Sequence, residues 1–125
     1  MFENTQDEIK QFIRSTAVNK TINPEKQSRH ILDSSGYIDG RSYLLDCVDA
    51  QALVDKYHGT GYVPLNHDGT WKNKETVSLD HWIAVNVNPV TGEKNLTNRF
   101  TIHYSRTGTH IVPSERSKNH ETMGI

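Results

Sequence analysis

The sequence is short of cysteine and of long apolar runs, and each shortage excludes a class of protein. Its only cysteine, Cys47, cannot form an internal disulfide or a cysteine-rich zinc module. Because Cys47 lies among apolar neighbours, we expect it to be a small buried hydrophobe. No apolar run approaches the roughly 20 residues that span a bilayer, and the N-terminus has no signal-peptide core. We therefore expect no membrane partner and no secretory signal.

The chain is also short of hydrophobic residues and of net charge. Hydrophobic residues make up 34% of its 125 residues, against a usual share of roughly 45–50% when glycine is counted. This length and composition predict one domain with a small core. The net charge of −1 argues against a sequence-independent duplex binder, which is normally more basic.

The basic residues are nevertheless concentrated in two places. Between residues 94 and 118 the only acidic residue is Glu115, among five lysines and arginines. A second basic cluster, Lys26, Arg29 and His30, lies far away in the sequence. This pattern predicts a local site for a phosphate or another anion.

Residues 101–113 predict a β-hairpin with two histidines on one face, because apolar and polar residues alternate before a Thr-Gly turn. A turn centred on Thr107 and Gly108 pairs Ser105 with His110. The same register makes His103 and His110 diagonal neighbours, roughly 7 Å apart. That separation suits a general acid and a general base on either side of a phosphate.

The remaining pattern predicts an α+β fold, with N-terminal helices packed on an antiparallel β-sheet. Residues 1–24 are expected to be a lead-in helix and linker, and residues 25–125 a domain with a polar C-terminal tail. Asp49 is expected to cap a helix, and Gly59 to end it. The predicted helices are residues 5–18 and 49–57, and the predicted strands are residues 43–47, 77–79, 81–87 and 95–105.

Two segments of this pattern resemble a known family. K-Q-S-R-H-I at residues 26–31 and I-H-Y-S-R-T-G-T-H-I-V-P at residues 102–113 are similar to the two end motifs of polymorphic toxin type 50 domains. Between them G-R-S (40–42), L-V-D-K-Y-H-G-T-G (53–61) and T-G-E-K (91–94) follow in the family's order, so the likeness covers roughly residues 25–113. The chain departs from the family at Arg106, where a lysine is expected, and in a longer segment at residues 66–74.

The resemblance implies a metal-independent ribonuclease with a barnase/EndoU/colicin/RelE-like fold and no cofactor. It also implies a toxin that is delivered or phage-encoded and acts on RNA in the cytoplasm of a bacterium. A cognate immunity protein would restrain it, and the domain would form the C-terminal part of a larger carrier protein.

The residue types suit this chemistry, because RNA can be cut by its own 2′-hydroxyl if a base, an acid and a cation surround the phosphate. We expect His103 and His110 to share the acid and base roles, with either assignment open. Lys26 and His30 are expected to complete the cleft. The residues expected to bind the substrate are Arg29, Thr60, Trp71, Ser105, Arg106 and Thr109, with Trp71 stacking on a base.

Two alternatives remain. His30, His103 and His110 could bind zinc with Asp80 in a zinc-dependent hydrolase, although no histidine pair has the spacing of a common zinc motif. A non-catalytic module that binds RNA or phosphate is the other alternative. Cleavage of RNA in the presence of EDTA separates these possibilities.

Overall fold

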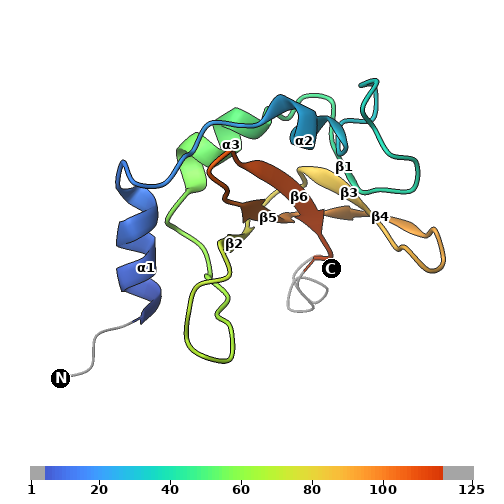
Figure 1. Ribbon diagram of the computed structural model, residues 1–125. Helices are drawn as coiled ribbons and strands as arrows, with labels where there is room; N and C mark the ends of the chain where they lie inside the picture. Colours follow the sequence, from blue (N-terminus) through green and yellow to red (C-terminus); the bar gives the residue numbers. More distant parts are fainter. Residues whose placement is uncertain (1–4, 117–125) are drawn as a thin grey trace.

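The computed structural model describes residues 5–116 and confirms an α+β fold (Figure 1). The predicted polar tail therefore lies mostly outside the described residues, as does the start of the lead-in segment. Within residues 5–116, no helix is both long and apolar enough to cross a membrane. The elements are α1 (Thr5–Arg14), α2 (Pro24–Ser28), α3 (Ala50–Tyr57), β1 (Tyr43–Leu44), β2 (Lys74–Ser78), β3 (Ala84–Val87), β4 (Lys94–Thr97), β5 (Arg99–His103) and β6 (His110–Ser114).

The strands form two antiparallel three-stranded sheets, in the orders β1-β3-β4 and β2-β5-β6. The single strand expected over residues 95–105 is divided at Asn98, which is buried. Thr97 pairs with Ala84 in one sheet, whereas Arg99 pairs with Ser78 in the other. The Asn98 side-chain amide donates to the carbonyl of Leu79 at 2.6 Å. This bond holds the chain where it passes from one sheet to the other.

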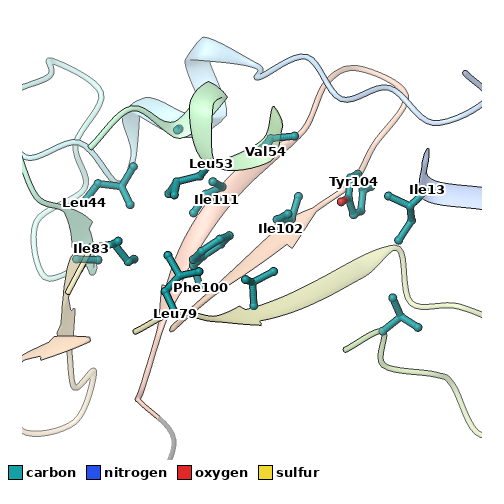
Figure 2. Close-up of a cluster of buried hydrophobic side chains, with 14 residues drawn as sticks. Ile13, Leu44, Leu53, Val54, Leu79, Ile83, Phe100, Ile102, Tyr104 and Ile111 are labelled. Atoms are coloured by element: carbon teal, nitrogen blue, oxygen red, sulfur yellow. The ribbon is translucent and has the colours of Figure 1, made fainter. Parts of the chain in front are cut away.

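The core lies against one face of the β2-β5-β6 sheet, where α3 covers it (Figure 2). Phe100 and Ile102 of β5 and Ile111 of β6 are fully buried. Leu53 and Val54 of α3 belong to the same apolar cluster. Because side chains alternate along a strand, the residues between the buried ones, including His103, point to the opposite face of the sheet.

Helix α2 is fixed along the free edge of β6 by a buried amide. Gln27 donates from Nε2 to the Ile111 carbonyl at 3.0 Å, and its Oε1 accepts from the Ile111 N–H at 2.6 Å. The start of α2 is set by Asn23, whose side chain accepts from the Lys26 N–H, and by Pro24 in the first turn. An edge strand with unpaired backbone groups is therefore covered by a helix that carries basic residues.

The other helices largely follow the sequence pattern. Asp49 caps α3 as predicted, accepting from two backbone N–H groups. Gly59 follows that helix with a φ of 77°, the left-handed conformation expected after a helix end. Cys47 is exposed, so the prediction of a buried thiol was wrong. Residues 45–48 form a turn after β1 and do not extend the strand.

Helix α1 ends at Arg14, earlier than residue 18, and packs against the rest of the chain. Ile13 is fully buried, and the Gln6 amide exchanges two hydrogen bonds with the backbone of Val63, at 2.8 and 2.9 Å. After the helix, Lys20 Nζ donates to the carbonyls of residues 13, 15 and 18. This ammonium binds one carbonyl in the last turn of α1 and two in the segment that follows it. The division at residue 24 stays a prediction.

A buried carboxylate joins the loop after α3 to the sheet. Glu75 of β2 is fully buried and accepts from the Gly59 N–H at 2.9 Å and the Gly61 N–H at 2.7 Å. The Tyr104 hydroxyl donates to the same carboxylate at 2.7 Å. Burial of Tyr104, followed by the charge of Glu75, raises the pKa of this phenol, so it stays a donor.

We expect Glu75→Gln to destabilise the fold by about 2–3 kcal/mol, because an amide has one acceptor oxygen and its NH₂ would face a backbone N–H. Tyr104→Phe should cost less, about 1–2 kcal/mol, because it removes one donor and leaves two. Urea unfolding of these variants, with the exposed Glu93→Gln as control, measures the difference. Equal stability of Glu75→Gln and Glu93→Gln would contradict the expectation.

Candidate active site

The hairpin of β5 and β6 brings His103 and His110 closer together than the sequence predicts. The two residues are direct cross-strand partners, and their ring centroids lie 4.8 Å apart. The predicted register, in which Ser105 pairs with His110 and His103 with Val112, is wrong by two residues. A shift of two residues keeps each side chain on its face of the sheet, so the prediction that both histidines share a face is confirmed.

Beyond the histidines the hairpin closes in a tight turn, in which the Gly108 N–H donates to the Ser105 carbonyl at 3.1 Å. The Tyr104 N–H donates to the Asn73 carbonyl at 2.8 Å, and the Thr109 N–H donates to the Thr21 carbonyl at 2.9 Å. These two N–H groups point away from the opposite strand of the hairpin, so they tie its two sides to the neighbouring segments.

His30 adds a third imidazole from the end of α2. It is 4% exposed, and its ring stacks on that of His110 with centroids 6.3 Å apart. Its Nδ1 lies 2.8 Å from the Ser42 carbonyl. Because a carbonyl only accepts, Nδ1 carries the proton. The three rings thus lie in a row, with His110 in the middle.

Cationic side chains surround this row. Lys26 Nζ donates to the Thr107 hydroxyl at 3.0 Å and lies 3.4 Å from the Ser105 hydroxyl oxygen. Arg29 is exposed, and its positive charge helps to lower the pKa of His110. The structure therefore brings the distant segment of residues 26–30 to the hairpin, as the sequence predicted.

Lys74 is a neighbour of the site that the sequence analysis missed. It begins β2 and is the cross-strand partner of His103 on the side away from His110. Its charge is the second cause, after burial, of the lowered pKa of His103. Lys74 lies at the end of the polar segment of residues 66–74, and no local pattern shows that this residue begins a strand paired with β5.

The pKa values of the two hairpin histidines are both lowered to about 4. Burial is the largest cause for each, and neighbouring positive groups add to it. The pKa of His30 is also lowered, again mainly by burial. Near neutral pH all three imidazoles are therefore uncharged in the free protein. A bound anion would raise these pKa values by favouring the protonated form.

Four of the predicted substrate-binding residues lie apart from the histidine row or have their side chains engaged elsewhere. Thr109 is buried, and its hydroxyl donates to the His103 carbonyl at 2.6 Å. Thr60 donates to the Tyr57 carbonyl in the loop after α3. Trp71 packs on Tyr104, on the core side of β5, with ring centroids 5.5 Å apart. Arg106 is exposed at the tip of the hairpin.

The zinc alternative finds no support in the geometry. Within residues 5–116, no group of three histidine, cysteine, aspartate or glutamate side chains is placed to hold a metal ion. Asp80, the acidic partner considered for zinc, bonds to the ring of its neighbour His81 at 2.8 Å.

Comparison with known proteins connects this site to a family. The family model described as Bacterial toxin 50 matches residues 22–113, which is 92 of the 125 residues. The match includes both end motifs and confirms the resemblance drawn from them. No curated protein matches the chain.

The lowered pKa values can be measured by NMR titration of the imidazole protons. We expect His103 and His110 to titrate near pH 4. In Lys74→Gln the pKa of His103 should rise more than that of His110, because Lys74 acts on His103. In His103→Asn the pKa of His110 should rise, because His103 helps to lower it. Titration of both rings near pH 6.5 in the wild type would show that they are not desolvated.

Proposed function

The chain belongs to the bacterial toxin 50 family, and we propose that it is an endoribonuclease toxin that cuts RNA without a metal ion. The observation that carries the proposal is the pair His103 and His110, side by side on one face with ring centroids 4.8 Å apart and Lys26 beside the hairpin loop. Transesterification of a phosphodiester requires a general base, a general acid and a cation near the phosphate, and two imidazoles and a lysine can supply these groups.

In the proposed reaction, one imidazole takes the proton of the RNA 2′-hydroxyl, and the 2′-oxygen forms a bond to phosphorus. The bond from phosphorus to the 5′-oxygen breaks, and the second imidazole donates a proton to that oxygen. The products are a 2′,3′-cyclic phosphate and a 5′-hydroxyl. Either histidine can take either role.

The imidazole that acts as the acid takes up its proton when the substrate binds. Both hairpin histidines have a pKa of about 4 in the free protein, so a single-proton state of the pair is poorly populated at neutral pH. The charge of a phosphodiester next to the rings raises their pKa values and favours one protonated imidazole. Substrate binding thus prepares the pair for acid–base catalysis.

The flanking cations stabilise the charge that develops on the phosphorane. Lys26 lies above the loop at one side of the pair, and Lys74 is beside His103 at the other. The buried ring of His30 stacks on His110 and limits its rotation. Lys26 and Lys74 contribute as point charges, and His30 is a positioning residue.

The family membership supports a proposal about the biological setting. A ribonuclease toxin must be restrained in the cell that makes it, so we propose a cognate immunity protein that covers the histidine cleft. The chain would act in the cytoplasm of a bacterium, where RNA is accessible, after delivery as the C-terminal part of a carrier protein or after expression from a phage.

Replacement of either hairpin histidine should remove most of the activity. We expect His103→Ala and His110→Ala each to lower the rate of RNA cleavage by roughly 10²–10⁴-fold, the usual contribution of a general acid or base. Cleavage of total RNA is measured with EDTA present, and the fragment ends are tested for cyclic phosphate. His67→Ala, in an exposed loop, is the matched control.

Other outcomes of this assay point elsewhere. Cleavage that EDTA abolishes would establish metal-dependent chemistry. Retention of RNA on a filter without any cleavage would favour the non-catalytic binding module. Full activity in a folded His103→Ala or His110→Ala protein would overturn the acid–base assignment.

Lys26 should matter through its charge on the transition state. We expect Lys26→Gln to lower kcat by roughly 10²-fold while changing KM much less, because the phosphorane carries more charge than the ground state. Lys56→Gln on the exposed face of α3 serves as the control. A loss confined to KM would instead show that Lys26 binds the substrate without assisting the chemistry.

A further inference from the structure

A cavity of 970 Å³ lies at the tip of the candidate active-site hairpin. One wall is formed by residues 12 and 14–21, from the end of α1 and the segment after it. The opposite wall is the hairpin loop at residues 104–106, and Trp71 and Asn73 line the space as well. The volume falls within the range of roughly 300–1,000 Å³ that is typical of small-molecule sites.

The lining combines exposed aromatic surface with positive charge. Phe12 is 51% exposed and meets Trp71 edge to face, with ring centroids 6.2 Å apart. Arg106 lines the cavity with an exposed side chain. Arg14 and Lys20 line it too, with their charged groups bonded to backbone carbonyls, and no acidic residue lines it. Aromatic rings for stacking and cations for the backbone are the features of sites that bind single-stranded nucleic acid.

The cavity adjoins the histidine row through the hairpin loop. Ser105 lines the cavity, and its hydroxyl oxygen lies 3.4 Å from Lys26 Nζ. Tyr104 also lines the cavity, from the core side of β5 and so from the face opposite to His103. An RNA strand with one phosphate at the histidines would pass around the hairpin tip at Ser105 to place its next nucleotide in the cavity.

We propose that this cavity is a subsite for the unpaired base of the nucleotide adjacent to the cleaved phosphate, an inference that rests on the proposed function. The base stacks on Trp71 and Phe12, while the Asn73 amide binds a base edge and Arg106 binds the next phosphate. Residues 12 and 14–21 precede the family match, which starts at residue 22. The lead-in segment therefore supplies one wall of the substrate site.

The two tryptophans make the proposal testable by fluorescence. In the Trp82→Phe variant, all tryptophan fluorescence comes from Trp71. In the Trp71→Phe variant it comes from Trp82, which is 41% exposed and does not line the cavity. The probe is a 2′-O-methyl RNA tetranucleotide, which lacks the attacking hydroxyl, and the comparison probe is the same backbone with abasic residues. We expect the first probe to quench Trp71 and leave Trp82 unchanged. It should bind roughly 10-fold more tightly than the abasic probe, the contribution of about one stacked base.

Two variants test the lining residues without disturbing the fold. Phe12→Ala shortens a half-exposed side chain, and Asn73→Gly removes the amide at a position whose φ of 61° suits glycine. Each variant should lower the affinity for the 2′-O-methyl probe, and Phe12→Ala should lower it by roughly 10-fold. The affinity for the abasic probe should stay unchanged in both variants. Circular dichroism checks the fold.

The outcomes separate this proposal from the proposed function. Quenching of Trp71 by the uncleavable probe in a protein that never cuts RNA would support the subsite and refute the ribonuclease. RNA cleavage together with equal affinity for the two probes would support the ribonuclease and overturn the subsite. Equal quenching of both tryptophans, or no effect of Phe12→Ala on binding, would also overturn it.

Discussion

Gln27 supplies both a donor and an acceptor to the backbone of Ile111, on the free edge of β6. Ile111 lies next to His110, and Gln27 lies between Lys26 and the end of α2 that carries His30. One buried amide therefore sets how the two basic segments of the chain meet. Because an amide that loses a partner in the interior is costly, the geometry tolerates little displacement. The stacking of His30 on His110 and the reach of Lys26 to the hairpin loop both depend on it.

The core and the candidate active site share the same strands. Phe100, Ile102 and Tyr104 alternate with Thr101 and His103, so one strand packs the interior with one set of residues and lines the site with the other. Glu75 reinforces this arrangement from β2, where it binds the loop after α3 and the Tyr104 hydroxyl on the core side. The histidines thus lie on a sheet whose opposite face is well packed, which favours a preorganised site.

The electrostatic state of the site follows from its position at the rim of the core. Burial and neighbouring cations keep His103 and His110 neutral in the free protein, and a bound anion would favour their protonated form. In the proposed reaction, the same cations would attract the substrate and stabilise the transition state. In the proposed reaction, neither imidazole could act as the acid until a phosphate is bound, so substrate binding would be coupled to the uptake of one proton.

Local features could be predicted from the sequence. Asp49 caps α3 because its side chain reaches backbone groups two and three residues away. The alternation around His103 and His110 placed both on one face even with an incorrect register, since a shift of two residues conserves the face. The end motifs identified the family, because such a pattern depends only on residue order.

The features that the sequence did not reveal depend on contacts between distant segments. The division of the long strand at Asn98 follows from its bond to Leu79. Strand pairing places Lys74 beside His103. Side-chain packing places Trp71 between Phe12 and Tyr104.

The amino-acid sequence by itself determined the types of elements and the shared face of the histidines, through local hydrogen bonding and periodicity. Only the tertiary structure decided which distant side chains surround them, because those contacts form when segments far apart in the chain pack together.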